Sequence, residues 1–202
     1  MPKITKLTSQ KRGEFVNLYI DDEFFCGLSL NQVAAHRLHK GQEMTDAELL
    51  ALKQEANQSK AYHAGLRYVS LRIRSEKEMQ DYLRRKGYED DAVTAALARL
   101  RSERYLNDID FTERWIAMRR AQHWSPRAIQ ADLMKKGLRI DSADPTMAQG
   151  ESIQDSIASL IHKKTRHRTV EREKLMQFLA GKGFQYADIK LALDSYESEI
   201  NL

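Results

Sequence analysis

The stretch YLRRKGY (residues 82–88) recurs in altered form as DLMKKGL (132–138) and FLAGKGF (178–184). When Gly87, Gly137 and Gly183 are superimposed, a leucine stands four residues before each glycine, a lysine directly before it and an apolar residue directly after it. Apolar residues four apart share one face of a helix. A glycine just past such a face is typical of a left-handed C-terminal cap. The sequence therefore predicts the same helix, with the same end, three times.

The spacing of these glycines, 50 and then 46 residues, indicates a stack of helical units. We expect a mainly α fold built from tandem three-helix repeats in an elongated array. The expected modules are an N-terminal β-strand and helix module at 1–60, repeat one at 61–107, repeat two at 108–150 and repeat three at 151–202. In repeat two, Pro145 and Gly150 interrupt the third helix, which we expect to be short or irregular.

Within the first module, alternating apolar and polar residues between about residues 3 and 28 predict a three-stranded β-meander. Separate helices are then expected at about 45–61 and 62–73. Asp90 or Asp91 is expected to cap the helix that follows Gly87. Two capping boxes are also predicted, Thr45 with Glu48 and Ser75 with Glu78.

The composition favours a soluble protein. Of the 202 residues, 42% are hydrophobic, which is enough for a core, and 31% are charged. No apolar run approaches the roughly 18 residues that suggest a membrane span, and the N-terminus lacks the apolar stretch of a signal peptide. A single cysteine, Cys26, rules out an internal disulfide and fits a reducing, cytoplasmic location.

Signatures of catalysis are missing from the sequence. It contains no P-loop and no GxGxxG, GxSxG or HExxH motif. His162 and His167 are five residues apart, which does not place them on one helix face as a metal pair requires. We therefore expect no enzyme, no catalytic residue, no metal and no cofactor.

Charge alternates in sign along the repeats. Net charges of +4, +6 and +5 fall on residues 61–87, 114–139 and 162–183, and −4, −4 and −3 on 88–113, 140–161 and 184–202. Lysine and arginine contacts to phosphates supply most sequence-independent affinity for nucleic acid, but basic residues near helix C-termini also complement the helix dipole. Recurrence in three units favours a binding surface. Its candidate residues are Arg74, Arg84, Arg85, Lys86, Arg119, Arg120, Arg127, Lys135, Lys136, Lys163, Lys164, Arg166, Arg168 and Lys182.

We expect Arg119 and Arg120, and likewise Lys163 and Lys164, to be exposed, so that reversing either pair to Glu leaves the fold intact. The aromatic residues Trp115, Tyr88 and Phe184 are interpreted as core rather than as platforms for stacking bases. Gly87, Gly137 and Gly183 are interpreted as structural caps.

Three stretches, RSEKEMQDYLRRKGY (74–88), RLRSERYLNDIDFTERWIAMRR (99–120) and SPRAIQADLMKKGL (125–138), resemble the RecX family, bacterial regulators of the RecA recombinase. The N-terminal segment resembles the β extension of some members. The sequence departs from the family pattern in two places in the later repeats. The third helix of repeat two is degraded around Pro145, and Gly181 replaces a second basic residue beside Lys182.

The resemblance implies a regulator that is not an enzyme. Its expected partners are RecA and the RecA nucleoprotein filament, in whose groove it lies to restrain ATP hydrolysis, strand exchange and co-protease activity. It also implies binding of single- and double-stranded DNA without strong sequence preference. The expected setting is DNA repair, homologous recombination and the SOS response, with a monomer in the cytoplasm and no membrane contact.

Two alternatives remain open at the level of sequence. SPRAIQADLMKKGL (125–138) reads like part of a helix-turn-helix, which favours a stand-alone DNA-binding regulator. Apolar repeat faces favour a scaffold that binds only proteins. Sequence-blind DNA binding with a steep salt dependence, operator selectivity, or no DNA binding distinguishes the three possibilities.

Overall fold

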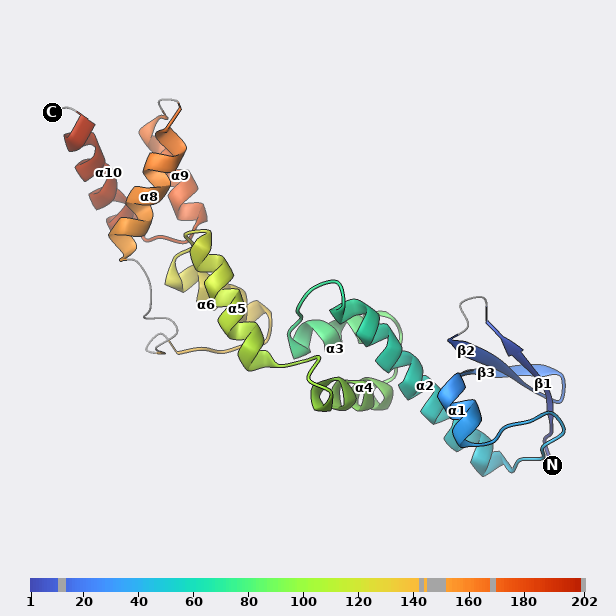
Figure 1. The fold of residues 1–202 in the computed structure, drawn as a ribbon. Coiled ribbons are helices and arrows are strands. Elements are labelled where there is room, and N and C mark those ends of the chain that lie inside the picture. Colours follow the sequence, from blue (N-terminus) through green and yellow to red (C-terminus); the bar gives the residue numbers. More distant parts are fainter. Residues whose placement is uncertain (11–13, 142–143, 145–151, 168–169, 201–202) are drawn as a thin grey trace. The chain divides into compact units, whose positions relative to one another are not determined.

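A computed structural model describes residues 1–10, 14–141, 144, 152–167 and 170–200 (Figure 1). The chain is mainly helical with a small N-terminal sheet, which confirms the predicted fold class. It divides into two compact units, Met1–Asn107 and Asp108–Leu202. The division into four modules at 1–60, 61–107, 108–150 and 151–202 remains a proposal.

The N-terminal sheet is the predicted antiparallel meander. Strands β1 (Ile4–Ser9), β2 (Phe15–Ile20) and β3 (Glu23–Ser29) pair in the order β1-β2-β3. Alternate residues of β2 are buried, as expected for a sheet with one face on a core. The short helix α1 (Leu30–Ala35) follows, and Ser29 caps it through a capping box with Gln32.

Helix α2 (Asp46–Val69) is one continuous helix of 24 residues. The prediction of separate helices at about 45–61 and 62–73 was therefore wrong. No proline interrupts the segment, and its single interior glycine, Gly65, is buried against Leu100 of a neighbouring helix. Tertiary packing holds the glycine in a helix that its intrinsic propensity disfavours.

The two halves of α2 serve two different cores. Its first half gives Leu49, Leu52 and Ala56 to the core under the sheet. Its second half gives Ala61, Tyr62 and Ala64 to a core that it shares with α3 (Glu76–Arg85) and α4 (Asp90–Ser102). Figure 1 shows the sheet and α3 with α4 near opposite ends of this helix. The sheet module and repeat one therefore share one helix.

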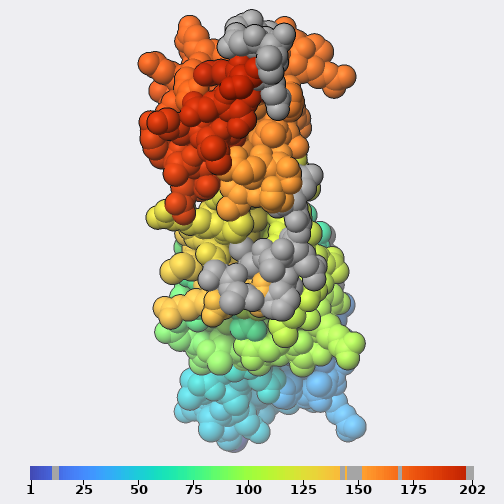
Figure 2. Space-filling model, turned by 90° about the vertical axis from the view of Figure 1, so that its left-hand side faces the viewer, coloured from blue at the N-terminus to red at the C-terminus, as the bar shows by residue number. Residues whose placement is uncertain are grey.

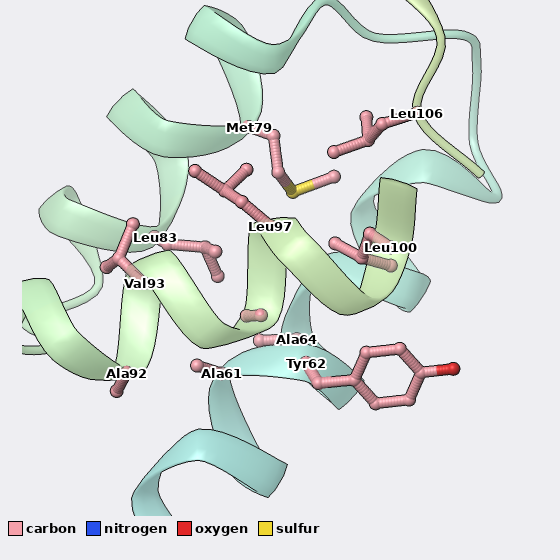
Figure 3. Close-up of a cluster of buried hydrophobic side chains, with 11 residues drawn as sticks. Ala61, Tyr62, Ala64, Met79, Leu83, Ala92, Val93, Leu97, Leu100 and Leu106 are labelled. Atoms are coloured by element: carbon pink, nitrogen blue, oxygen red, sulfur yellow. The ribbon is translucent and has the colours of Figure 1, made fainter. Parts of the chain in front are cut away.

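The core of repeat one is made of aliphatic side chains from three helices (Figure 3). Met79 and Leu83 of α3 meet Leu97 and Leu100 of α4, and all four are buried. Tyr62 lies at the edge with its hydroxyl directed away from the cluster (Figure 3), and this hydroxyl donates to Glu103. The aromatic ring is therefore in the core while its polar group reaches a carboxylate.

The observed helix caps agree with the prediction at two helices and differ from it at a third. The capping boxes at Thr45 and Ser75 are both formed, which confirms them. The N-cap of α4 is Glu89, without a side-chain cap bond, and not Asp90 or Asp91 as predicted. Both aspartates lie instead in the first turn, where a carboxylate is favoured by the helix dipole.

The second unit carries α5 (Asp108–Ala121) and α6 (Pro126–Lys135), then α8 (Ile153–Thr165), α9 (Arg172–Gly181) and α10 (Tyr186–Ile200). The last three helices enclose one core. Figure 2 shows the red α10 lying against the orange α8 at the surface. The irregular third helix predicted for repeat two, around Pro145 and Gly150, lies outside the described residues.

The three repeated glycines end α3, α6 and α9 in the same way. Their φ angles are +83° at Gly87, +81° at Gly137 and +84° at Gly183. Each glycine amide donates to the carbonyl three residues earlier, at 2.9, 3.0 and 2.8 Å respectively. The next amide donates to the carbonyl of the leucine five residues earlier, at 3.3, 3.0 and 3.3 Å. Paired bonds of this kind form a Schellman motif.

Gly183 has a second requirement that Gly87 lacks. A Cβ placed at Gly183 would lie 2.5 Å from the Ala128 Cβ and 2.8 Å from the Ser125 Oγ, whereas a Cβ at Gly87 would have no neighbour within 4 Å. The end of α9 is thus packed directly on the start of α6. This close approach joins repeats two and three.

Gly183→Ala should lower the free energy of unfolding by about 2 kcal/mol or more, because strain at positive φ adds to the steric overlap. Gly181→Ala, two residues earlier, is the matched control. It lies within α9 with no neighbour within 4 Å of an added Cβ, so it should stabilise by roughly 0.5–1 kcal/mol. Urea unfolding followed by tryptophan fluorescence measures both. If both variants changed the free energy of unfolding equally and in the same direction, the special requirement for glycine at position 183 would be contradicted.

Candidate functional site

The lysine before each repeated glycine lies over an aromatic ring. The Nζ atom is 5.9 Å from the centre of the Tyr82 ring for Lys86, 4.2 Å from Trp115 for Lys136 and 5.4 Å from Trp124 for Lys182. A cation over a ring face is attracted by the ring quadrupole. The recurring lysines are therefore held at defined positions, although each uses a different ring.

Candidate cations from repeats two and three meet at one tryptophan, Trp124. The Arg119 guanidinium carbon is 4.5 Å from the centre of the Trp124 ring and 4.8 Å from that of Trp115. Lys182 donates from Nζ to the Gln122 carbonyl at 3.0 Å. We call Arg119, Trp124 and Lys182 the Trp124 cluster. It brings together two candidate residues from helices that are far apart in the sequence, since Gln122 and Lys182 are separated by 60 residues.

Hydrogen bonds from Ser125 to the backbone of residues 182 and 183 hold the two helix ends of this cluster together. The Ser125 hydroxyl donates to the Gly183 carbonyl at 2.6 Å, and the Ser125 amide donates to the Lys182 carbonyl at 3.1 Å. Ser125 also caps α6 by accepting from the Ala128 amide. A single buried serine thus starts one helix and holds the end of another.

Positive charge dominates the surroundings of Lys182. Burial lowers the pKa of Lys182, and the nearby charges of Arg119 and Lys163 lower it further. Burial also lowers the pKa of Arg120. One carboxylate, Asp132, pairs with Arg119 at 2.7 Å. Cations that repel one another in this way gain from binding an anion.

Several candidate cations of the second unit are exposed, and one of them, Lys163, is close enough to lower the pKa of Lys182. Arg127, Lys135, Lys163 and Arg166 are exposed and have no ion pair among the residues that the structure describes. Lys164 lies with Nζ 4.8 Å from the centre of the Phe178 ring. The predicted candidate Arg168 lies outside the described residues. Repeats two and three therefore carry both fixed and unpaired positive charges.

In repeat one, several candidate cations already have partners. Arg84 pairs with Asp90 at 2.9 Å, and Arg85 donates from Nε to the Asp81 carbonyl at 3.2 Å. Lys86 is exposed. Asp90, in the acidic segment after the glycine, thus neutralises part of the basic segment before it.

The expectation of exposure was wrong for Arg119, Arg120 and Lys164, and other candidate cations are partly or largely buried as well. Arg74 is only 9% exposed. The Arg119 side chain is 20% exposed, because it packs on two tryptophans and bonds to Asp132. Arg120 is half-buried. Reversal of Arg119 to Glu therefore cannot leave the fold untouched.

Sequence reasoning missed two members of this region, Trp124 and Asp132. Asp132 accepts from both Trp115 Nε1 and Arg119 Nε, each at 2.9 Å. Neither residue belongs to a recognisable motif. The one available signal was the position of Trp124 directly before the helix start at Ser125 and Pro126, where a residue often folds onto the helix it precedes.

Neither a metal-binding cluster nor a membrane-spanning helix is formed by the residues that the structure describes. Among the described residues, no three His, Cys, Asp or Glu side chains gather as a metal ion requires. None of the helices described is both long and apolar enough to cross a bilayer.

Comparison with known proteins identifies the family. Residues 2–45 match the family model described as "Regulatory protein RecX N-terminal domain", and residues 61–100 match "RecX, first three-helix domain". Regulatory protein RecX of Bacillus pumilus is 28% identical over 209 residues, which covers 98% of this chain and 80% of the relative. The chain belongs to the RecX family. The RecX protein of Listeria innocua is 29% identical, with 99% of this chain and 78% of the relative covered.

A solved structure shows the same RecX fold. A crystal structure of regulatory protein RecX superimposes with a TM-score of 0.66 at 24% identity, covering 96% of this chain and 100% of that one. Membership of the family assigns this chain a regulatory role.

Arg119→Glu should lower the free energy of unfolding by about 2 kcal/mol or more, because it removes the partner of a half-buried carboxylate and places a second carboxylate beside it. Lys135→Glu, an equal reversal at an exposed position of α6, should change stability by less than about 0.5 kcal/mol. Urea unfolding followed by tryptophan fluorescence compares them. Two neutral variants would show that the Trp124 cluster has no structural role.

Proposed function

We propose that this RecX-family chain inhibits RecA by binding in the groove of the RecA–DNA filament, where it restrains ATP hydrolysis, strand exchange and co-protease activity. It also binds single- and double-stranded DNA on its own, without strong sequence preference. It acts by binding rather than catalysis, as a cytoplasmic monomer, in DNA repair, homologous recombination and the SOS response.

The Trp124 cluster is the observation that carries the DNA-binding part of this proposal. It gathers Arg119 and Lys182 with Lys163 nearby, and one carboxylate offsets them. Phosphates satisfy such a group, because each bound phosphate replaces repulsion between cations with attraction and releases counterions from the nucleic acid. The rings hold the cations in place before binding, which reduces the entropy cost of complex formation.

The geometry disfavours the helix-turn-helix alternative. A recognition helix reads base edges with residues at its N-terminus. The N-terminus of α6 is instead packed against the end of α9, with the Ser125 hydroxyl bonded to the Gly183 carbonyl. The unpaired exposed cations likewise disfavour a scaffold that binds only proteins.

The double reversal Lys135→Glu with Lys163→Glu should raise the dissociation constant for single-stranded DNA about tenfold or more. Both side chains are exposed and unpaired among the described residues, so the fold should be unchanged. The slope of log K against log salt should also become shallower, by about 0.7 for each phosphate that the variant no longer neutralises. Fluorescence anisotropy at several salt concentrations measures both quantities.

The matched control is the reversal of Lys40 and Lys53 to Glu. Both lysines are exposed in the first unit, away from the Trp124 cluster in sequence. This variant has the same net charge as the test variant and should bind DNA much more tightly than it. Equal weakening by both pairs would mean that overall charge, not a local surface, controls DNA binding.

A further inference from the structure

Arg74 is a buried cation without a carboxylate. It is 9% exposed, and its Nε atom is fully buried with no hydrogen-bond partner. Over the residues that the structure describes, no carboxylate forms an ion pair with its guanidinium. Buried polar groups in native proteins are nearly always hydrogen-bonded, so an orphan of this kind requires an explanation.

Aromatic stacking accounts for the position of Arg74 but not for its charge. Its guanidinium carbon lies 3.8 Å from the centre of the Tyr68 ring, and Tyr68 is itself stacked on Tyr82 at 3.9 Å with an interplanar angle of 6°. Two groups this close to one ring must lie on opposite faces of it. The stack orients the guanidinium plane, while no described residue accepts a hydrogen bond from the buried N–H group at Nε.

Neighbouring residues do not supply the missing acceptor. Glu76, the nearest carboxylate in sequence on α3, pairs with Arg101 at 2.6 Å. Glu78 accepts from the Ser75 amide at 3.2 Å and from Arg72 at 3.0 Å. It is therefore occupied by its capping box and by a different arginine. Because Nε is buried, a ligand reaches the Arg74 guanidinium through its two terminal nitrogens.

The loop that ends at Arg74 also exposes apolar side chains. Leu71 is 77% exposed and Ile73 is 37% exposed. A duplex backbone offers such side chains nothing to bury against, whereas a protein surface does. An unpaired guanidinium beside exposed aliphatic groups matches a carboxylate side chain flanked by apolar residues, since planar carboxylates pair with arginine through two parallel hydrogen bonds.

We propose that the loop of residues 71–74 docks a partner protein through such an acidic and apolar segment, with Arg74 as the anchor that binds the carboxylate. This surface is formed by residues of the first unit and the basic one by residues of the second, so protein binding and DNA binding can be altered by different substitutions. The inference rests on the proposed function only for the identity of the partner used as a probe.

The test measures binding of the full chain to RecA filaments on single-stranded DNA and, separately, to the same DNA without RecA. Arg74→Met and Leu71→Ser should each weaken binding to the filament about tenfold and leave binding to bare DNA within about twofold. Arg74→Met should keep or raise the melting temperature, because replacing an unpaired buried cation with an apolar side chain is neutral or stabilising.

Two control variants make the test specific. Arg72→Met removes a charge from the same loop. Because Arg72 already forms an ion pair with Glu78, filament binding should fall much less than with Arg74→Met. Leu50→Ser removes a leucine that is 60% exposed elsewhere in the first unit and should have no effect.

The outcomes separate this inference from the proposed function. No filament binding by the unaltered chain would refute the proposed function. Filament binding that is unchanged in Arg74→Met, or abolished together with bare-DNA binding and thermal stability, would overturn the docking surface and leave Arg74 with a structural role.

Discussion

The left-handed backbone at Gly87, Gly137 and Gly183 is the constraint on which every repeat depends. At each glycine the chain reverses while two amides bond back to the end of the helix. The leucine that accepts the second bond is fully buried in all three repeats. One backbone conformation thus satisfies the helix end beside a leucine that belongs to the core of its repeat. A side chain with a Cβ strains this reversal wherever it occurs.

The same reversal determines where the charges lie. The lysine before each glycine ends its helix at a fixed position, and a different aromatic ring receives it in each repeat. In the third repeat the ring belongs to the preceding repeat, so the cap of α9 supplies both the joint with α6 and one cation of the Trp124 cluster. The structural role of the cap and the proposed binding role therefore overlap at Lys182 and Gly183. The lysine before the glycine recurs with the cap, but the ring and the ion-pair partners around it differ from one repeat to the next.

Local signals in the sequence were enough to predict the meander, the capping boxes at Thr45 and Ser75, and the repeated helix ends, because each depends on residues a few positions apart. The continuity of α2 was missed because a helix that serves two cores carries two apolar patterns with no breaker between them. The anchoring of Arg119 was missed for a different reason: its carboxylate is 13 residues away on another helix, and no local pattern records such an interaction. The sequence predicted the basic residues only as a group of candidates for a binding surface. Which of them are fixed, paired or buried depends on tertiary packing.

Regulation of RecA is the central claim, and one titration tests it most directly. Increasing amounts of the unaltered chain are added to RecA turning over ATP on single-stranded DNA, and the rate of hydrolysis is followed. A chain that occupies the filament groove should lower this rate in a saturable way, at concentrations well below those that coat free DNA. A rate that stays constant while the chain is shown to bind DNA under the same conditions would contradict the account and leave a DNA-binding protein without this regulatory activity.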